Sequence, residues 1–237
     1  MIGSLDLRLI LAVQTVGLPM EMRKTGFVPM HQEVAVRSLE SAGPWFGPRK
    51  TLEEREDYRQ VIPYIVLRVR DRFIRYTRTP TSGETRLHGR MSIGLGGHVD
   101  LLDAKSCGDR FDLLGTVEQA AKRELREELG ETPCDRRRWI GLLVDNDTSV
   151  GRVHIGLVGL WDIHDLPTGE SEDSVGGVMI ASLRELKADL ENLETWSALL
   201  LPWLESELKA GDRLDRLKCE VGDGHGSIWP SRQAVDE

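Results

Sequence analysis

The sequence has few cysteines, few aromatic residues and no surplus of positive charge, and each shortage excludes a class of protein. Three of its 237 residues are cysteine, and Cys107, Cys134 and Cys219 lie far apart without a C-x-x-C pair. An odd and scattered set of this kind argues against a disulfide framework and against a zinc knuckle. We therefore expect a reducing, cytoplasmic location.

Basic residues are outnumbered by acidic ones, 31 to 39, so the formal net charge is −8. Proteins that follow phosphate backbones or coat anionic membranes usually carry clustered Lys and Arg. No run approaches the roughly 20 apolar residues of a membrane-spanning helix. The apolar run 9–16 lacks signal-peptide flanks, since Asp6 and Arg8 precede it. Bulk nucleic acid and membranes are thus not expected partners.

The distribution of glycine and proline predicts three segments. Residues 1–50 contain these residues too often for a long element, and we interpret them as an N-terminal extension or accessory segment. Residues 51–210 carry the strand and helix patterns of a folded domain. The tail 211–237 includes Gly222-Asp223-Gly224-His225-Gly226 and is expected to be loosely ordered.

Within the domain, β-branched and aromatic runs of strand length are bounded by turn-forming residues. They predict strands over 61–69, 72–78, 92–98, 139–144 and 153–161. Three capping boxes predict helices: Thr51 opens a short one to about Tyr58, Thr116 one that ends at Gly130, and Ser182 a tract to about Ala210. This order of elements predicts an α+β domain or an α/β/α sandwich.

Three glutamates crowd one turn of the central predicted helix. Glu124, Glu127 and Glu128 have i, i+3 and i, i+4 spacing, so they project from one helix face. Like charges at these spacings repel each other, so the cluster is unfavourable unless a cation binds it. Carboxylate oxygens on a rigid element select Mg²⁺ or Mn²⁺. A solvated acidic helix face is the alternative interpretation.

The segment 123–130, RELREELG, resembles the second half of the Nudix hydrolase box. That box runs Gly, five residues, Glu, seven residues, then Arg-Glu-apolar-x-Glu-Glu-x-Gly. The first half has a counterpart in Gly96-Gly97-His98-Val99-Asp100, but about a dozen residues are inserted before the second half. The resemblance covers about residues 61–205. The segment 93–98 is similar in particular to that of an uncharacterised subgroup of predicted phosphoesterases.

The insertion changes one position of the box. Gly115 stands eight positions before Arg123, where the family has glutamate. Asp109 or Asp112, both within the insertion, could restore a carboxylate.

The resemblance implies a Nudix-type α/β/α sandwich with a mixed β-sheet and a pyrophosphohydrolase or phosphoesterase that acts on phosphorus-containing anhydrides. The substrate would be a small molecule with a diphosphate linkage, typically a nucleoside diphosphate joined to another group, and the cofactor Mg²⁺ or Mn²⁺. Glu124, Glu127, Glu128 and the Gly97 carbonyl would be the metal ligands. Arg123 would orient the carboxylates, since its planar fork suits bidentate bonds.

The sequence offers several candidates for the general base and for the residues that contact phosphate. By resemblance, the base is either Glu124 or an acidic residue of the later loop 162–173, where Glu170 and Glu172 lie. Each residue of that loop could equally be part of a polar surface turn. The candidate substrate contacts are Arg75, Arg78, Arg86, Arg90 and His98. For each of them, a surface or structural role is the alternative.

Two further functions stay open at this point. A nucleotide-binding or regulatory protein on the same fold would have weak or no catalysis because of Gly115, and a structural protein would carry the acidic helix without function. Trp196 and Trp203 favour core packing over base stacking. The sequence identifies neither the diphosphate substrate nor the oligomeric state, with a homodimer as one alternative.

Overall fold

The computed structural model describes residues 8–79, 89–167 and 175–222. The chain divides into two compact units, Met1–Leu201 and Pro202–Glu237. Three residues named above, Arg86, Glu170 and Glu172, lie outside the described residues. Every site discussed below belongs to the first unit.

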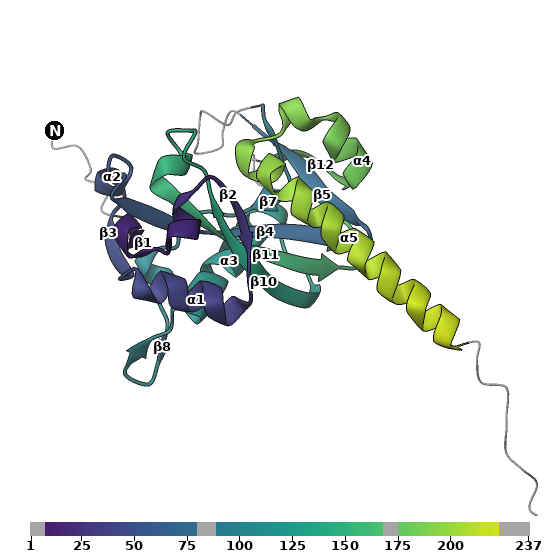
Figure 1. The fold of residues 1–237 in the computed structure, drawn as a ribbon. Coiled ribbons are helices and arrows are strands. Elements are labelled where there is room, and N and C mark those ends of the chain that lie inside the picture. Colours follow the sequence, from purple (N-terminus) through teal and green to yellow (C-terminus); the bar gives the residue numbers. More distant parts are fainter. Residues whose placement is uncertain (1–7, 80–88, 168–174, 223–237) are drawn as a thin grey trace, which may run out of the picture. The chain divides into compact units, whose positions relative to one another are not determined.

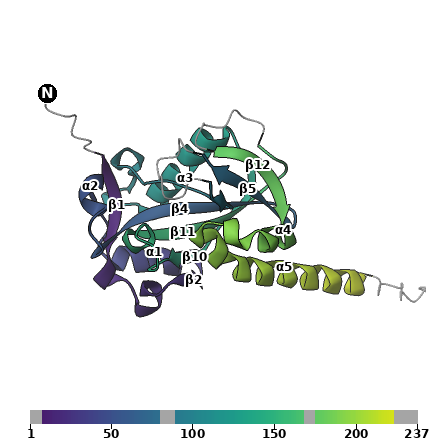
Figure 2. The ribbon, with the colours of Figure 1, turned by 90° about the horizontal axis from the view of Figure 1, so that it is seen from above.

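Ten strands of the described chain form one mixed sheet (Figure 1). Strands β4 and β11 are parallel, while the other neighbours along the main path are antiparallel. Seen from above, β4, β11 and β10 lie side by side (Figure 2). The strand order along the path is β12 (Val175–Ser182), β5 (Arg72–Arg78), β4 (Tyr58–Val69), β11 (His154–Ile163), β10 (Cys134–Val144) and β2 (Gly26–Pro29).

The segment before residue 50 takes part in this sheet. Strand β1 (Leu9–Gln14) pairs with β3 (Trp45–Pro48) and with β4, and β2 extends the sheet beside β10. Helix α1 (Gln32–Ser41) lies between β2 and β3 in the chain. Two short strands, β6 (Met91–Ser92) and β7 (Gly94–Leu95), pair with β5 and β4.

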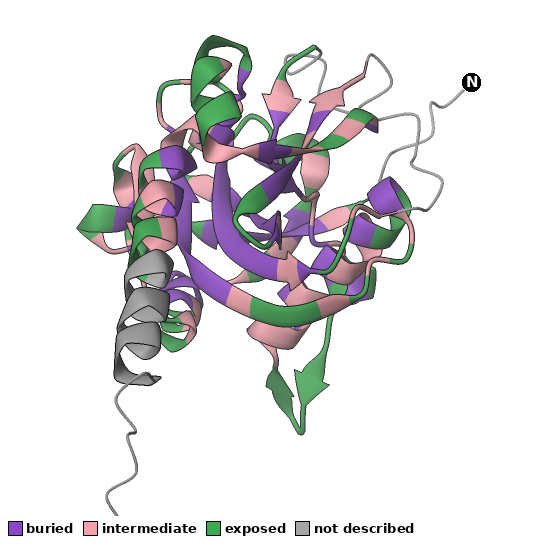
Figure 3. Cartoon of the chain, turned by 90° about the vertical axis from the view of Figure 1, so that its right-hand side faces the viewer, coloured by how far each residue is buried: buried purple, intermediate pink, exposed green. Residues whose placement is uncertain are grey.

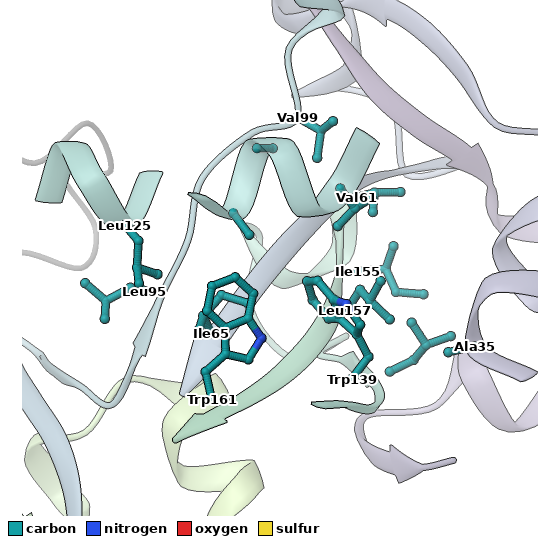
Figure 4. Close-up of a cluster of buried hydrophobic side chains, with 14 of the residues drawn as sticks. Ala35, Val61, Ile65, Leu95, Val99, Leu125, Trp139, Ile155, Leu157 and Trp161 are labelled. Carbon is teal, nitrogen blue, oxygen red and sulfur yellow. The ribbon is translucent and has the colours of Figure 1, made fainter. Parts of the chain in front are cut away.

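Helices α1 and α3 (Leu113–Leu129) share one hydrophobic core with the sheet. Residues of β4 alternate in direction, so Val61 and Ile65 enter this core, while Ile62 and Tyr64 face the opposite side. Leu125 of α3 lies against the same cluster (Figure 4). The remaining helices are α2 (Arg49–Leu52), α4 (Leu183–Ala188) and α5 (Thr195–Gly222). The expected α/β/α arrangement with a mixed sheet is confirmed.

The predicted helix ends are partly confirmed. Ser182 and Glu185 form the expected capping box of α4, and Gly130 ends α3 with a φ of 74°. The prediction for Thr116 is wrong, because α3 begins earlier and Asp112 caps it, accepting a hydrogen bond from Gly115 N at 2.9 Å. Thr116 is instead buried inside the helix.

One predicted helix is displaced, one predicted helical tract is interrupted, and one predicted strand is shorter than expected. Helix α2 begins at Arg49, after Pro48, instead of at Thr51. The tract from Ser182 is interrupted between α4 and α5. The strand predicted over 92–98 ends at Leu95 because the Gly96 backbone lies directly on the Pro63 carbonyl, where a side chain would not fit.

The insertion in the box forms an exposed hairpin. Strands β8 (Ser106–Cys107) and β9 (Arg110–Phe111) pair only with each other, and their residues are exposed (Figure 3).

Among the residues that the structure describes, no helix has the length and apolar character needed to cross a membrane.

Candidate active site

Arg123 links the residues of the box. Its Nη1 donates to Glu124 Oε1 at 2.7 Å and to Glu127 Oε2 at 3.1 Å, while Nη2 donates to the His98 carbonyl at 2.9 Å. Helix α3 places the arginine and both carboxylates on one face, and His98 follows the glycine pair. Arg123 therefore connects the box helix to the glycine loop.

Asp103 is the acidic partner of this arginine. Arg123 Nε and Nη2 donate to its two carboxylate oxygens at 3.1 and 2.8 Å, a bidentate pair. Asp103 is 4% exposed, and it also accepts a hydrogen bond from Asp100 N at 3.0 Å. The hydrogen bonds that Arg123 donates to Asp103 are the largest of the effects that raise the pKa of Arg123.

The spacing of the box could have identified Asp103 from the sequence. Five residues separate Gly97 from Asp103, which is the spacing of Gly and Glu in the box, so the insertion follows the acid instead of preceding it. Gly115, eight positions before Arg123, therefore belongs to the inserted residues and is not the position of the box acid. The other two candidates have different roles, since Asp112 caps α3 and Asp109 is exposed in the hairpin.

The three glutamates of the box differ in environment. The Glu124 side chain is 17% exposed, and burial is the main cause that raises its pKa, against the opposing effect of Arg123. Glu127 is largely exposed. Glu128 is buried, and its charge acts on Arg78 of β5 and on Tyr76. The three carboxylates therefore face different surroundings although they share one helix face.

The glycine loop lies directly against Glu124. A Cβ on Gly97 would overlap the Glu124 carboxyl group, so a main-chain carbonyl donor and a carboxylate donor are neighbours here. Oxygen donors of these two kinds fit Mg²⁺ or Mn²⁺. Within the described chain, no three His, Cys, Asp or Glu side chains are gathered tightly enough to hold an ion by themselves. Arg123 lies between Glu124 and Glu127 instead.

A cavity of about 490 Å³ adjoins the glycine loop. A volume of this order is typical of small-molecule sites. Its walls come from β4, the loop after β10, the glycine loop and the start of α5. The lining includes Ile62, Tyr64, Arg78, Arg90, Gly97, His98, Asp145, His154, Glu194 and Trp196.

Glu194 organises the charged end of the cavity. It is 5% exposed, accepts a hydrogen bond from Tyr64 Oη at 2.7 Å and contacts Arg78 Nε at 3.4 Å. Burial and the Glu194 charge raise the pKa of Tyr64 well above its ordinary value. Sequence reasoning missed Glu194, because an isolated glutamate between two helices carries no motif.

The expected phosphate contacts separate into two groups. Arg78, Arg90 and His98 line the cavity, and Arg90 donates to the Glu191 carbonyl at 2.6 Å. Arg75 points elsewhere: it pairs with Asp189 at 2.6 Å and does not line the cavity that the described residues enclose. Three of the four described candidates are therefore brought together.

His98 is held by two neighbours. Its Nε2 lies 2.8 Å from Gln60 Oε1 and 3.5 Å from His154 Nε2. Burial and the nearby His154 lower the pKa of His98 well below its ordinary value. A neutral His98 can contact a ligand as a hydrogen-bonding group without adding charge.

Trp196 forms part of the cavity wall and is not buried in the core. Its indole packs on Gly156 of β11, where a Cβ would collide with the ring. The Trp196 and Tyr64 rings meet edge to face, with centroids 5.3 Å apart. The cavity thus combines an aromatic wall with a charged end.

Gly97→Ala is expected to lower the hydrolytic activity that the resemblance implies about tenfold or more while the protein stays folded, since small displacements at a reacting centre have effects of this order or larger. The added methyl group would push the flexible Glu124 side chain away from the loop. The measurement is kcat beside the melting temperature. In a Glu124→Ala background the same substitution should have no further effect, and a full additional loss there would contradict the proposed clash.

No family model matches the sequence. Protein YmaB of Bacillus subtilis (strain 168) is 34% identical over 164 residues, which cover 66% of this chain and 76% of YmaB. The crystal structure of Tm1382, a protein assigned to the Nudix hydrolases, is similar with a TM-score of 0.67 and 26% identity. That similarity covers 83% of this chain and 97% of Tm1382.

Proposed function

Because this chain belongs to the Nudix hydrolase superfamily, we propose that it hydrolyses a diphosphate linkage in a nucleoside diphosphate joined to another group. The observation that carries the proposal is the contact of Gly97 with Glu124 at the edge of the cavity. Gly97 lines the cavity and lies against the Glu124 carboxyl group, which supports a site where one carboxylate of the box adjoins a space large enough for such a substrate.

Each residue has a proposed role. Glu124, Glu127, Glu128 and the Gly97 carbonyl would hold Mg²⁺ or Mn²⁺, which supplies positive charge and Lewis acidity to the phosphate oxygens. Arg123 would position the carboxylates, because it contacts Glu124 and Glu127 while Asp103 holds it from the other side.

The cavity would hold the rest of the substrate. Arg78 and Arg90 would donate hydrogen bonds to phosphate oxygens, which suit the planar guanidinium fork. His98 would donate or accept one further hydrogen bond. The proposed base is Glu124, which is partly buried beside Gly97, with Glu172 as the second candidate.

A panel of nucleoside triphosphates, nucleotide sugars, dinucleoside polyphosphates, coenzyme A and ADP-ribose tests the proposal. The full chain is incubated with each compound and Mg²⁺ or Mn²⁺, and the products are separated. Cleavage of at least one compound at its diphosphate, abolished by EDTA, is expected. If no compound is cleaved above the rate without protein, the proposed function is wrong.

Mg²⁺ or Mn²⁺ at millimolar concentration is expected to raise the melting temperature by a few degrees, since a ligand that binds the folded state stabilises it. Glu128→Gln should reduce this gain, because it removes one charge from the crowded helix face. Glu131→Gln is the matched control, since Glu131 is exposed at the helix end and pairs with Arg126. An equal metal response in both variants would contradict the proposed ligand set.

The alternative of a binding protein without catalysis depended on Gly115 in place of the box acid. Asp103 makes a bidentate contact with Arg123, so the first half of the box retains a carboxylate. This contact supports hydrolysis over binding without catalysis, and hydrolysis is the function that the geometry supports best.

A further inference from the structure

The loop 145–154, which joins β10 to β11 and includes His154 as the first residue of β11, forms one side of the cavity. Its cavity-lining residues come from almost the whole loop: Asp145, Thr148, Ser149, Val150, Gly151 and His154. The position of this loop therefore decides the width of the cavity and the contacts that a ligand makes.

Hydrogen bonds within the loop link several of its residues. The Asp145 carboxylate accepts hydrogen bonds from Asp147 N at 2.8 Å and from the Thr148 hydroxyl at 2.6 Å, and Gly151 N donates to Thr148 Oγ1 at 3.0 Å. A Cβ on Gly151 would overlap Asp145. These contacts lie within the loop, so its place against the rest of the fold depends on contacts from outside.

Asn146 makes three such outside contacts. Its main-chain N donates to Thr25 Oγ1 at 2.9 Å, and its Nδ2 donates to the Arg23 carbonyl at 2.8 Å. Its Oδ1 accepts a hydrogen bond from Arg59 Nη2 at 2.5 Å. Thr25 and Arg23 belong to the N-terminal segment, between the start of the 3-10 turn Met20–Arg23 and β2.

Arg59 holds the other end of the loop. This residue of β4 is 4% exposed, and its Nη1 donates to the carbonyls of Gly151 and His154 at 3.0 and 3.1 Å. Neither Arg59 nor Thr25 is among the described residues that line the cavity. Their effect on a ligand must therefore pass through the loop.

We infer that Asn146 is a positioning residue through which Thr25 and Arg23 hold the loop 145–154 against the cavity. The N-terminal segment thereby controls how tightly substrate binds, although it contributes no residue to the cavity lining described above. This inference rests on the proposed function, because it concerns the substrate of the same cavity.

Thr25→Val tests the inference, since valine has the shape of threonine without the hydroxyl acceptor. With the panel compound that the wild type cleaves fastest, KM should rise about fivefold, the effect of about one hydrogen bond, and kcat should stay within about twofold. Thr25→Ser keeps the hydroxyl and should restore the wild-type KM. A wild-type KM in Thr25→Val would overturn the inference.

Hydrogen exchange tests the same contact without a ligand. In Thr25→Val the amides of 145–154 should exchange about fivefold faster than in the wild type, while those of α3 are unchanged. If the wild type cleaves no compound, the proposed function fails, yet this measurement still decides the inference. Equal protection of the loop in both proteins would contradict it.

Discussion

Glu124→Gln is expected to lower kcat for diphosphate hydrolysis by about a hundredfold or more, the scale of losing one electrostatic group from a reacting centre. The substitution keeps the size of the side chain and removes its charge. Glu124 is the carboxylate that touches the glycine loop, so both of its proposed roles, metal ligand and base, depend on that charge.

Stability should change little in this variant. The charge of Glu124 is already disfavoured by burial and by the nearby acids Glu127 and Asp100. Arg123 keeps its contacts with Asp103 and Glu127 when the Glu124 charge is removed. The melting temperature measured without metal should therefore stay within a few degrees of the wild type.

Glu131→Gln is the matched control for kcat, because it removes an acidic charge just after the same helix at an exposed position. It should retain wild-type kcat. If Glu124→Gln stays within about threefold of this control, Glu124 is neither ligand nor base, and the role would pass to another acid such as Glu172.

Asp103→Asn is expected to lower the free energy of unfolding by about 3 kcal/mol, the lower end for breaking a buried ion pair by removing one partner. Asp103 is buried, and Arg123 places two nitrogens on its carboxylate. The asparagine has one acceptor oxygen and no charge, so the bidentate contact is lost. Urea unfolding of both proteins gives the difference.

The same variant should lower kcat about tenfold, because an arginine held from one side no longer fixes Glu124 and Glu127. Asp109→Asn is the control: it changes an exposed acid of the hairpin that follows Asp103 and should alter stability by less than about 0.5 kcal/mol. If Asp103→Asn has the same stability and the same kcat as Asp109→Asn, Asp103 does not hold Arg123 in place.

Local chemistry made several features predictable from the sequence. The box helix was recognised because its charges and apolar residues recur at helical spacing, and Gly130 ends it through its backbone freedom. The capping box at Ser182 was found for the same reason, since all its hydrogen bonds lie within four residues. The cap predicted at Thr116 is wrong because Asp112, four residues earlier, is an equally local capping residue and begins the helix.

The partners of the candidate residues were not predictable in this way. Arg75 and Arg78 are three residues apart on β5, yet one pairs with Asp189 and the other lines the cavity with Glu194. The two arginines have different partners because each side chain faces a different part of the fold. Strand alternation predicts that residues three apart on β5 point to opposite faces, but no short-range pattern records which distant residue each one meets.

The sequence by itself determined the family resemblance, the helix with three glutamates and the spacing from Gly97 to Asp103, because these are patterns along the chain. Its small number of cysteines argued against a disulfide framework, and its excess of acidic residues argued against bulk nucleic acid and membranes as partners. Neither feature located a site. Tertiary structure alone decided that Asp103 meets Arg123 and that Asn146 meets the N-terminal segment. Contacts between residues far apart in the chain form only when strand pairing and core packing bring them together, which is why the cavity and its supports became visible only in the folded protein.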